Sequence, residues 1–161
     1  MLQKFSLKGS VRLVSLDKVD KIILNMLQED ARKPFKEMAE RAGVSEATIH
    51  VRVKRLRREG VIKGFKAIVD PKLVGKATTA FILVKADQRT FSKAMEKVKG
   101  MDDVYEVYDV TGSYYAILKV RTKDTEELAS LIDKIGSVEG VTATETAVVL
   151  RSIKEELTIR L

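Results

Sequence analysis

The pattern of apolar residues changes character at Gly60, and this change constrains the fold more than any other feature of the sequence. Before Gly60, apolar residues return with the spacing of amphipathic helices. After it, runs rich in β-branched and aromatic residues predict strands, with two helical segments between them. Packed helices and a β-sheet require different spacings of apolar residues. The sequence therefore predicts two parts with different architectures.

The expected helices of the first part run over residues 17–29, 34–42 and 45–59. Asp17 and Asp20 lie at the start of the first helix, where free amides and the helix dipole favour carboxylates. Pro34 suits the first turn of the second helix, and Gly43 ends it. Ser45 then caps the third helix, which Gly60 stops.

The expected strands of the second part are 61–69, 77–86, 104–110, 114–121 and 142–152, and the expected helices are 90–98 and 124–135. After residue 75 the order is therefore β-α-β-β-α-β. A faint internal repeat supports this order, because Lys97 to Val104 parallels Lys134 to Val141 and each copy ends a helix and begins a strand. Two such halves with right-handed crossovers make an antiparallel sheet with both helices on one face. The predicted fold class is α+β, with a C-terminal ferredoxin-like βαββαβ domain.

The positive charge is concentrated in the first part of the chain. Residues 1–75 hold 17 Lys and Arg against 9 Asp and Glu, a net charge of +8, whereas residues 76–161 hold 13 against 14. Such a field favours a polyanionic partner, nucleic acid or an anionic membrane surface, although a merely soluble basic surface would look the same. The first 15 residues, with three basic side chains and no acid, are expected to form a loose basic arm.

The composition excludes several classes of function. The chain has no Cys and one His, so it lacks the residues for disulfides, thiolate zinc sites, Cys nucleophiles and multi-His metal sites. It has no Gly-rich phosphate loop and no obvious carboxylate–base pair, so we expect no enzymatic activity and no cofactor. No stretch approaches the ~20 apolar residues of a membrane span, and no signal peptide is recognisable. We therefore expect a soluble, cytoplasmic protein without a membrane partner.

A short turn, Ala42-Gly43-Val44-Ser45, joins the second and third expected helices and permits only a close, steep crossing. Gly43 can adopt a positive φ there, and the arrangement is typical of a helix-turn-helix motif. On a helical projection of the third helix, Ile49, Val53 and Leu56 share the side that we expect to pack. The opposite side, which we expect to face outward, carries Ala47, His50, Val51, Lys54, Arg57 and Arg58.

In such motifs the start of the second helix meets base edges in the major groove, and later basic residues contact phosphates. The residues expected near bases are Glu46, Ala47, Thr48, His50, Val51 and Lys54, and those expected at phosphates are Arg55, Arg57 and Arg58. Val51 fits a thymine methyl group, or else it is an ordinary apolar surface residue. His50 is expected to be a neutral surface contact, and Arg52 to form an ion pair with Asp17 or Asp20 or to contact DNA.

The sequence resembles the Lrp/AsnC family, the leucine-responsive or feast/famine transcription regulators, over residues 16 to 155. The resemblance rests on Leu16-Asp17-x-x-Asp20-x-x-Ile23-Leu24, Ala31-Arg32, Glu37-Met38-Ala39, Gly43-Val44-Ser45-x-x-Thr48-Ile49-x-x-Arg52-Val53-Lys54-Arg55-Leu56 and Gly60-Val61-Ile62-Lys63-Gly64-Phe65. It implies a sequence-specific regulator of transcription that binds double-stranded DNA through an N-terminal winged-type helix-turn-helix domain. It also implies a C-terminal regulatory domain that pairs into dimers, often assembles further, and binds a small molecule, commonly an amino acid, between domains.

The expected segments are the basic arm at 1–15, the helix-turn-helix DNA-binding domain at 16–61, a linker strand and hinge at 62–75, and the ferredoxin-like regulatory and oligomerisation domain at 76–161. A helix-turn-helix of about 45 residues has a small core, and a two-fold operator is read best by a two-fold protein. We therefore expect a homodimer, with long apolar strands burying one sheet face against a partner.

The sequence departs from the family in the turn between the middle strands, where the family has Gly-x-x-Asp and this chain has Gly112-Ser113-Tyr114-Tyr115. An acid there would hold a ligand ammonium, whereas the Tyr115 phenol offers only hydrogen bonds or a cation–π face. Any effector site is expected at Tyr108, Thr111, Gly112, Ser113 and Tyr115, with backbone amides of the turn facing a carboxylate. Alternatively, Thr111 to Ser113 is only a tight hairpin.

Two other binding functions compete with this one. Lys63-Gly64-Phe65 begins like the aromatic motif of RNA-binding sheets, but Lys66 replaces the small residue that should follow and no paired aromatic platform is evident. The stronger alternative is a sequence-tolerant architectural DNA-binding protein that uses the same helices and responds to no effector. Tyr115 favours that alternative.

Overall fold

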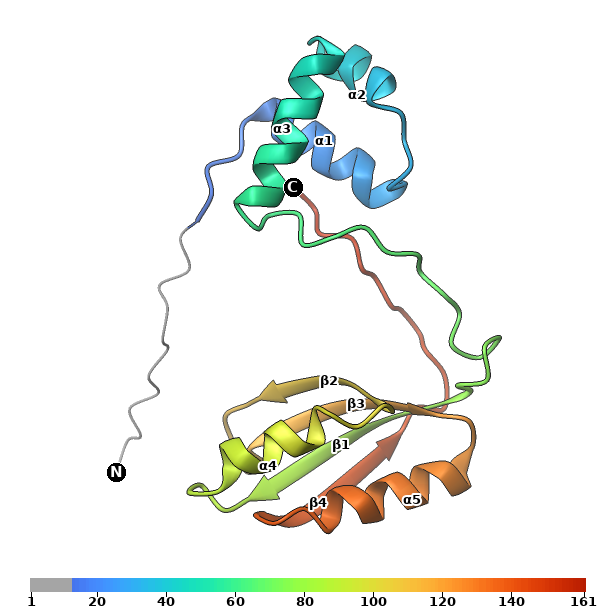
Figure 1. The fold of residues 1–161 in the computed structure, drawn as a ribbon. Coiled ribbons are helices and arrows are strands. Elements are labelled where there is room, and N and C mark those ends of the chain that lie inside the picture. Colours follow the sequence, from blue (N-terminus) through green and yellow to red (C-terminus); the bar gives the residue numbers. More distant parts are fainter. Residues whose placement is uncertain (1–12) are drawn as a thin grey trace. The chain divides into compact units, whose positions relative to one another are not determined.

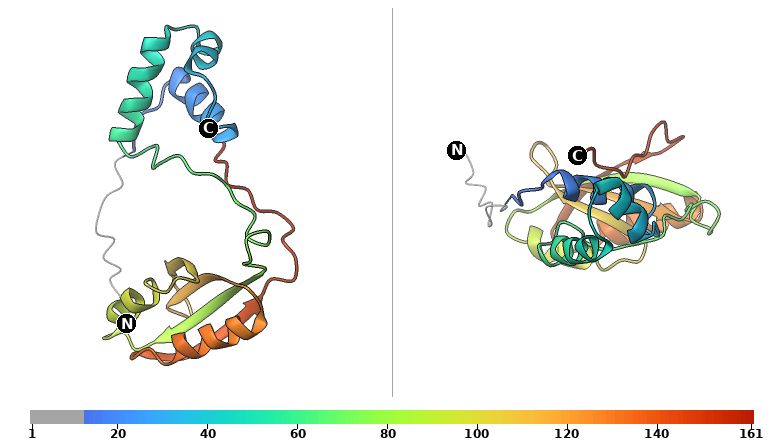
Figure 2. Two further views of the ribbon diagram at one scale, coloured as in Figure 1. Left: turned by 45° about the vertical axis from the view of Figure 1, so that its right-hand side comes forward. Right: turned by 90° about the horizontal axis from the view of Figure 1, so that it is seen from above.

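The computed structural model describes residues 13–161, so the part of the expected basic arm at 1–12 lies outside the described residues. The described residues form two compact units (Figures 1 and 2). One contains the described residues up to Ala67 together with Glu156–Leu161, and the other spans Ile68–Glu155. Between residues 13 and 161, no helix is long and apolar enough to cross a membrane.

The first unit contains three helices, α1 (Lys18–Glu29), α2 (Phe35–Ala42) and α3 (Glu46–Arg58). Their buried faces meet in one core, in which Ile23 of α1, Met38 of α2 and Ile49 of α3 are fully buried. At the start of α1, the Asp17 carboxylate accepts the N–H of Asp20, and the Asp20 carboxylate accepts the N–H of Asp17. This capping box satisfies amides that the helix itself leaves without partners.

The second unit contains β1 (Thr78–Ala86), α4 (Phe91–Val98), β2 (Val104–Asp109), β3 (Ala116–Thr122), α5 (Thr125–Gly136) and β4 (Val141–Val148). The four strands form one sheet in the order β2-β3-β1-β4, and every neighbouring pair is antiparallel. This is the ferredoxin-like βαββαβ arrangement, so the predicted fold class is confirmed.

Strand alternation divides this sheet into a covered and an open face. In β1, Ile82 and Val84 are fully buried, whereas Phe81 beside them is exposed. In β3, Leu118 and Val120 are buried in the same core. Both α4 and α5 lie over this apolar face (Figures 1 and 2) and contribute Ala94, Met95, Val98, Leu128, Leu131 and Ile135 to the core.

Two sequence-based boundaries differ from the structure. Residues 61–69, expected as a strand, form neither a helix nor a strand. A strand needs a hydrogen-bonded partner strand, and among the described residues this segment has none; its Ile62 N–H donates instead to the Leu56 carbonyl oxygen of α3 at 3.1 Å. The last strand ends at Val148 rather than near 152, because its partner β1 begins at Thr78 and the final pairing bond is Val149 N–H to Thr79 O. The other helices and strands agree with the prediction to within one or two residues at each end.

Candidate nucleic-acid interface and effector turn

The turn between α2 and α3 is closed by main-chain and side-chain hydrogen bonds. Gly43 adopts a left-handed φ of 68°, which an L side chain would strain. The Val44 N–H donates to the Ala39 carbonyl oxygen at 3.1 Å. Ser45 then caps α3, since its Oγ accepts the Thr48 N–H at 3.1 Å. These contacts fix where α3 begins and how it leaves α2.

The two sides of α3 differ in burial as the helical projection predicts. Ile49, Val53 and Leu56 are buried in the core of the unit. The residues exposed on the other side are Glu46, Ala47, His50, Val51, Lys54, Arg57 and Arg58. Thr48 is half-buried, and its hydroxyl lies 2.8 Å from Ser45 Oγ. Most of the residues expected at DNA therefore share one solvent-facing surface, which we call the α3 surface.

An aromatic contact packs His50 of the α3 surface against α2. The ring of His50 meets the ring of Phe35 in α2 edge-on, with centroids 4.8 Å apart and an interplanar angle of 81°. Such an edge-to-face pair limits the rotamers of both rings. Val51 remains 69% exposed on the same surface, with charged neighbours along the helix.

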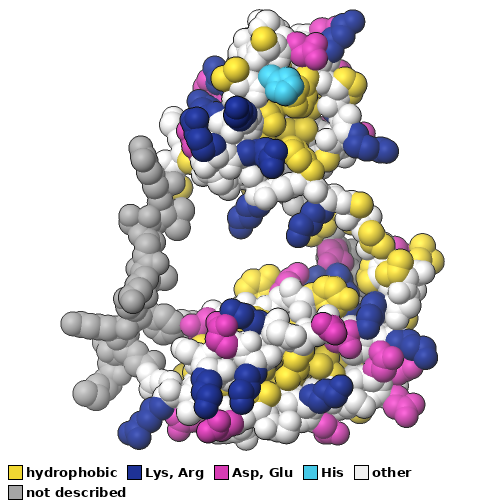
Figure 3. All heavy atoms as spheres, viewed as in Figure 1, with side chains coloured by type: hydrophobic (Ala, Val, Ile, Leu, Met, Phe, Trp, Pro, Cys, Tyr) yellow, Lys and Arg dark blue, Asp and Glu magenta, His cyan; other side chains and the backbone are white. Residues whose placement is uncertain are grey.

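The basic side chains of the α3 surface have no acidic partner among residues 13–161. Lys54, Arg57 and Arg58 make no ion pair with any residue between 13 and 161. Arg57 lies over the ring of Phe65, with 6.0 Å between the guanidinium carbon and the ring centroid. In Figure 3 dark-blue basic side chains gather on the same face as the cyan His50, the only His of the chain. This face therefore keeps positive charge available for an anion.

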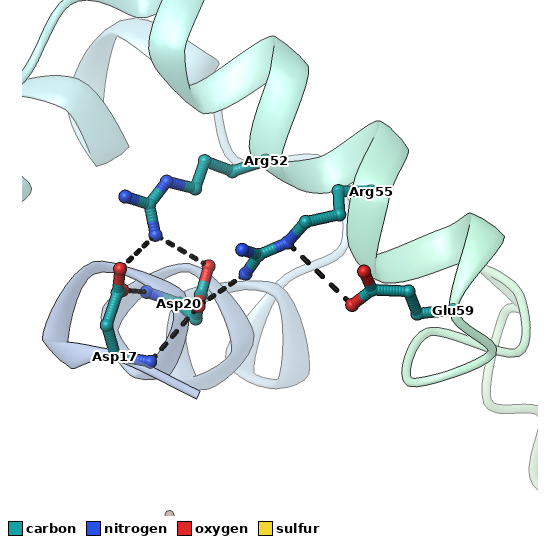
Figure 4. Close-up of polar contacts among 5 residues, drawn as sticks. All are labelled: Asp17, Asp20, Arg52, Arg55 and Glu59. Carbon is teal, nitrogen blue, oxygen red and sulfur yellow. Dashed lines mark hydrogen bonds and ion pairs between the residues drawn. The ribbon is translucent and has the colours of Figure 1, made fainter. Parts of the chain in front are cut away.

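Arg55, which the sequence predicts at phosphate, forms ion pairs within its own unit in this structure. Its Nη2 lies 2.5 Å from Oδ2 of Asp20, and its Nε lies 3.8 Å from Oε2 of Glu59 (Figure 4). Arg52 occupies the other side of the same carboxylate at 3.1 Å and also pairs with Asp17. The physical reason is burial: Asp20 is 1% exposed, and a buried carboxylate needs cationic partners.

These ion pairs and hydrogen bonds shift the pKa of Asp17. The hydrogen bond from Arg52, followed by the backbone N–H of Asp20, lowers the pKa of Asp17 from 3.8 to about 2. Arg52 shows the reciprocal effect, because its hydrogen bonds to Asp17 and Asp20 raise its pKa. The sequence left the partner of Arg52 open between an ion pair and DNA, and here it forms the ion pair.

Two contacts of α3 were not predicted from the sequence. Neither the Phe35–His50 pair nor the Asp20–Arg55 pair was expected. The Asp20–Arg55 pair could have been predicted from the sequence, because Arg55 follows Arg52 by three residues. The two side chains are therefore neighbours on the helix. The Phe35–His50 pair depends on how α2 and α3 cross, for which the sequence carries no comparable signal.

The expected effector turn lies between β2 and β3. Thr111, Gly112 and Ser113 are exposed, and Gly112 has a positive φ of 122°. The Tyr115 N–H donates to the Val84 carbonyl oxygen at 2.9 Å, so the far end of the turn is tied to β1. The turn is thus a defined hairpin end with open main-chain amides, which agrees with both interpretations offered by the sequence.

Within one chain, the two tyrosines expected at the effector site lie on opposite sides of the sheet. Tyr108 pairs with Ile117, whose position alternates with buried ones, so Tyr108 lies on the open face. Its hydroxyl donates to Oε2 of Glu106 at 2.8 Å, and this bond raises the pKa of Tyr108. Tyr115 instead lies 5.9 Å, ring to ring, from Phe91 of α4. The two side chains do not line one pocket.

A polar cavity of about 570 Å³ lies at the other end of this sheet, away from the turn. It includes the ion pair between Lys76 Nζ and Asp103 Oδ1 at 2.5 Å. That ion pair, through the hydrogen bond to Asp103, raises the pKa of Lys76. None of the expected effector residues contributes to the cavity.

Comparison with known proteins decides the family. The family model described as AsnC-type helix-turn-helix domain matches residues 16–57. The family model described as Lrp/AsnC ligand binding domain matches residues 79–159. The chain is also 43% identical over 142 residues to the HTH-type transcriptional regulator FL11 of Pyrococcus horikoshii, covering 88% of this chain and 94% of the relative. The chain belongs to the Lrp/AsnC family.

Solved structures of Lrp/AsnC proteins agree with this assignment. AsnC from Escherichia coli matches with a TM-score of 0.87 at 33% identity, covering 92% of this chain and 100% of that one. A feast or famine regulatory protein from M. tuberculosis, complexed with L-methionine, matches with a TM-score of 0.85 at 28% identity, covering 91% and 100%. Lrp/AsnC proteins are transcriptional regulators, so the predicted family and functional class are confirmed.

Proposed function

We propose that this Lrp/AsnC-family chain binds double-stranded DNA through the α3 surface and regulates transcription at discrete sites. The observation that carries the proposal is the composition of that surface. Exposed Val51 lies next to Lys54 on a helix whose outer cations have no ion-pair partner among residues 13–161. Phosphates would neutralise the cations, and a base methyl group would cover the valine. A surface that only keeps the protein in solution needs neither the unpaired cations nor the exposed valine.

We assign base proximity to the exposed start of α3 and phosphate contact to its end. The proposed base-proximal residues are Glu46, Ala47, Thr48, His50, Val51 and Lys54, and the proposed phosphate contacts are Arg57 and Arg58. The Phe35–His50 contact supports the placement of His50, because it packs that ring against α2. Arg55 is left out, since its guanidinium is already paired with Asp20.

We propose a free amino acid as the effector, bound at the turn that contains Gly112. The family domain over residues 79–159 is described as ligand binding, and the M. tuberculosis neighbour is complexed with L-methionine. Open amides at Gly112 and Ser113 suit the carboxylate of such a ligand. Glu106, an acid on the adjoining strand, would compensate for the family acid that Tyr115 replaces. Since Tyr108 and Tyr115 lie on opposite sides of one sheet, the pocket would need a second chain.

We further propose a homodimer that associates into larger assemblies. Large apolar side chains remain exposed on the open sheet face and on the extended segments beside it. They include Phe81, Tyr105, Tyr108, Ile68, Leu150 and Ile153, of which Leu150 is 95% exposed. In such a dimer, the segment 61–69 would pair as a strand with the second chain. Sedimentation of the full chain at micromolar concentration tests this, and a monomer would contradict it.

An architectural DNA-binding protein without an effector is the second candidate, and Tyr115 is the observation that favours it. In either case we propose a binding protein without catalytic activity or cofactor, located with the chromosomal DNA in the cytoplasm.

Footprinting on genomic DNA, with and without a mixture of amino acids, separates the two candidates. A regulator protects discrete sites, and the amino acids change that protection. An architectural protein spreads along the DNA and ignores them. Binding that does not weaken as salt rises would contradict both, because each uses phosphate contacts.

A further inference from the structure

We propose that Asp17 and Asp20 act as internal counterions, which withhold Arg52 and Arg55 from DNA phosphates and so limit binding that is independent of sequence. This inference rests on the proposed use of α3 to bind DNA. It assigns a role to two acidic residues at the start of α1 that lie behind the α3 surface and are not themselves expected to touch a base.

The geometry joins two carboxylates at the start of α1 to two guanidinium groups of α3, and a third carboxylate, Glu59, lies 3.8 Å from Arg55 Nε. Arg52 Nη1 contacts Asp17 and lies 3.1 Å from Oδ1 of Asp20, and Arg55 Nη2 lies 2.5 Å from Oδ2 of Asp20 (Figure 4). Asp20 thus receives one arginine on each oxygen. The four charges cancel, so the contribution of these two arginines to the field of α3 is largely removed.

This cancellation matters because of how α3 is charged. Five of its residues are basic: Arg52, Lys54, Arg55, Arg57 and Arg58. Three of them have no ion-pair partner within the described part of the chain, and the other two are paired with Asp17 and Asp20. Each cation that reaches a phosphate releases counterions and strengthens binding to any sequence alike. Pairing two of the five inside the protein therefore lowers affinity for all DNA and leaves base contacts untouched.

The two arginines are held near solvent rather than locked in the core. Their side chains are 26% and 32% exposed, although the Asp20 side chain between them is 1% exposed. Arg55 Nε is buried without a hydrogen-bond partner among the described residues, so the internal position does not satisfy that guanidinium fully. Long arginine side chains on the flank of a helix in the major groove lie within reach of the backbone that lines the groove. Loss of both carboxylates would leave Arg55 with only Glu59, at 3.8 Å, and Arg52 with no ion pair among the described residues, so that phosphate becomes the better partner for both.

The test measures how the affinity of the full chain for a short duplex of random sequence depends on salt. The slope of log K against log salt steepens by about 0.9 for every further phosphate that the protein neutralises. We expect Asp20→Asn to steepen it by about 0.9 per chain, because Arg55 loses its contact at 2.5 Å whereas Arg52 keeps Asp17. Affinity at low salt should rise, and the ratio of specific to random binding should fall. Asp30→Asn is the matched control, because Asp30 lies in the same unit, pairs with Arg32, and loses the same charge.

Asp17→Asn keeps the test decisive if Asp20→Asn fails to fold. The Asp17 side chain is 51% exposed, and asparagine also caps helices well. It should steepen the slope by up to about 0.9 per chain, and adding Arg52→Gln should restore the original slope. Unchanged slopes in folded variants would overturn the inference and leave the quartet a purely structural link between α1 and α3. A wild-type chain that binds no DNA would instead contradict the proposed function.

Discussion

The side-chain amide of Gln28 in α1 forms two hydrogen bonds with the main chain of Ile159. The Ile159 N–H donates to Oε1 at 2.7 Å, and Nε2 donates to the Ile159 carbonyl oxygen at 3.0 Å. The chain has already passed through the sheet of the second unit when it returns to this helix. The last six residues, Glu156–Leu161, thereby belong to the same compact unit as α1.

Replacing Gln28 with Ala should release the C-terminal residues. Two exposed hydrogen bonds contribute about 1 kcal/mol in total, and the exposed side chains of Leu157 and Ile159 supply little further packing. Backbone ¹⁵N relaxation should show the order parameters of residues 156–161 falling from the rigid range toward about 0.6 or below. Gln88→Ala, at an exposed position of the second unit, is the control. Unchanged order parameters would show that other contacts hold these residues.

Base reading and phosphate contact should separate by mutation along α3. Lys54→Ala should change the preferred sequence if Lys54 touches a base, whereas Arg58→Ala should weaken binding to all sequences and reduce the salt slope by about 1. Binding titrations on a specific and a random duplex measure both effects. Equal losses on the two duplexes for both variants would mean that the reading face is misplaced.

Val51 allows a sharper test, because the proposed contact can be removed from either partner. The valine can be replaced in the protein, and the thymine methyl group can be removed from the DNA. Replacing each thymine of the bound site by uracil in turn should identify one position that costs about 1 kcal/mol with the wild-type chain. Val51→Ser should cost about the same on thymine DNA and abolish the difference between thymine and uracil there. If no position distinguishes the two bases, the exposed Val51 is an ordinary surface residue.

The ion pair of Asp17 with Arg52 should make stability depend on acid. The folded pKa of Asp17 lies at about 2, below its ordinary value of 3.8. A lowered pKa adds stability that is fully present above the ordinary value and is lost as pH falls through the folded value. The difference in unfolding free energy between the wild type and Asp17→Asn should therefore be constant from neutral pH to about 5. It should shrink as pH falls from there toward 2, as measured by urea denaturation. A constant difference at all pH values would contradict the ion pair.

Much of the fold was predictable because its signals are local. The spacing of Ile49, Val53 and Leu56 identifies the buried side of α3 without any knowledge of its neighbours, and the alternation in β1 does the same for the sheet. The expected strand at 61–69 is different. Residues such as Ile68 and Val69 have strand propensity, but a strand also requires a partner, and the described chain supplies none.

The interface was predictable only in part for a similar reason. The exposure of Val51 and Lys54 follows from their place on the helix, but the position of Arg55 depends on a carboxylate 35 residues away. Helical projection places Arg55 on the rim between the packed and exposed sides, where its direction is decided by what lies opposite. Asp20 lies there, and the cost of burying a lone carboxylate decides the outcome.

Amino-acid binding should respond to the residue at position 115. Titration calorimetry with the common amino acids should show weak binding to the wild type, because a phenol cannot neutralise a ligand ammonium. Tyr115→Asp should strengthen that binding, whereas Gly112→Val should abolish it, since φ at Gly112 is 122° and a β-branched residue cannot adopt it without strain. Tyr115→Phe is the control, because it keeps the contact with Phe91 and adds no charge. If Tyr115→Asp folds and binds amino acids no more tightly than the wild type, either another acid already holds the ammonium group or the turn is only a hairpin. Measuring Glu106→Gln beside it separates these outcomes: weaker binding of an amino acid in that variant would place the ammonium at Glu106 on the open face of the sheet.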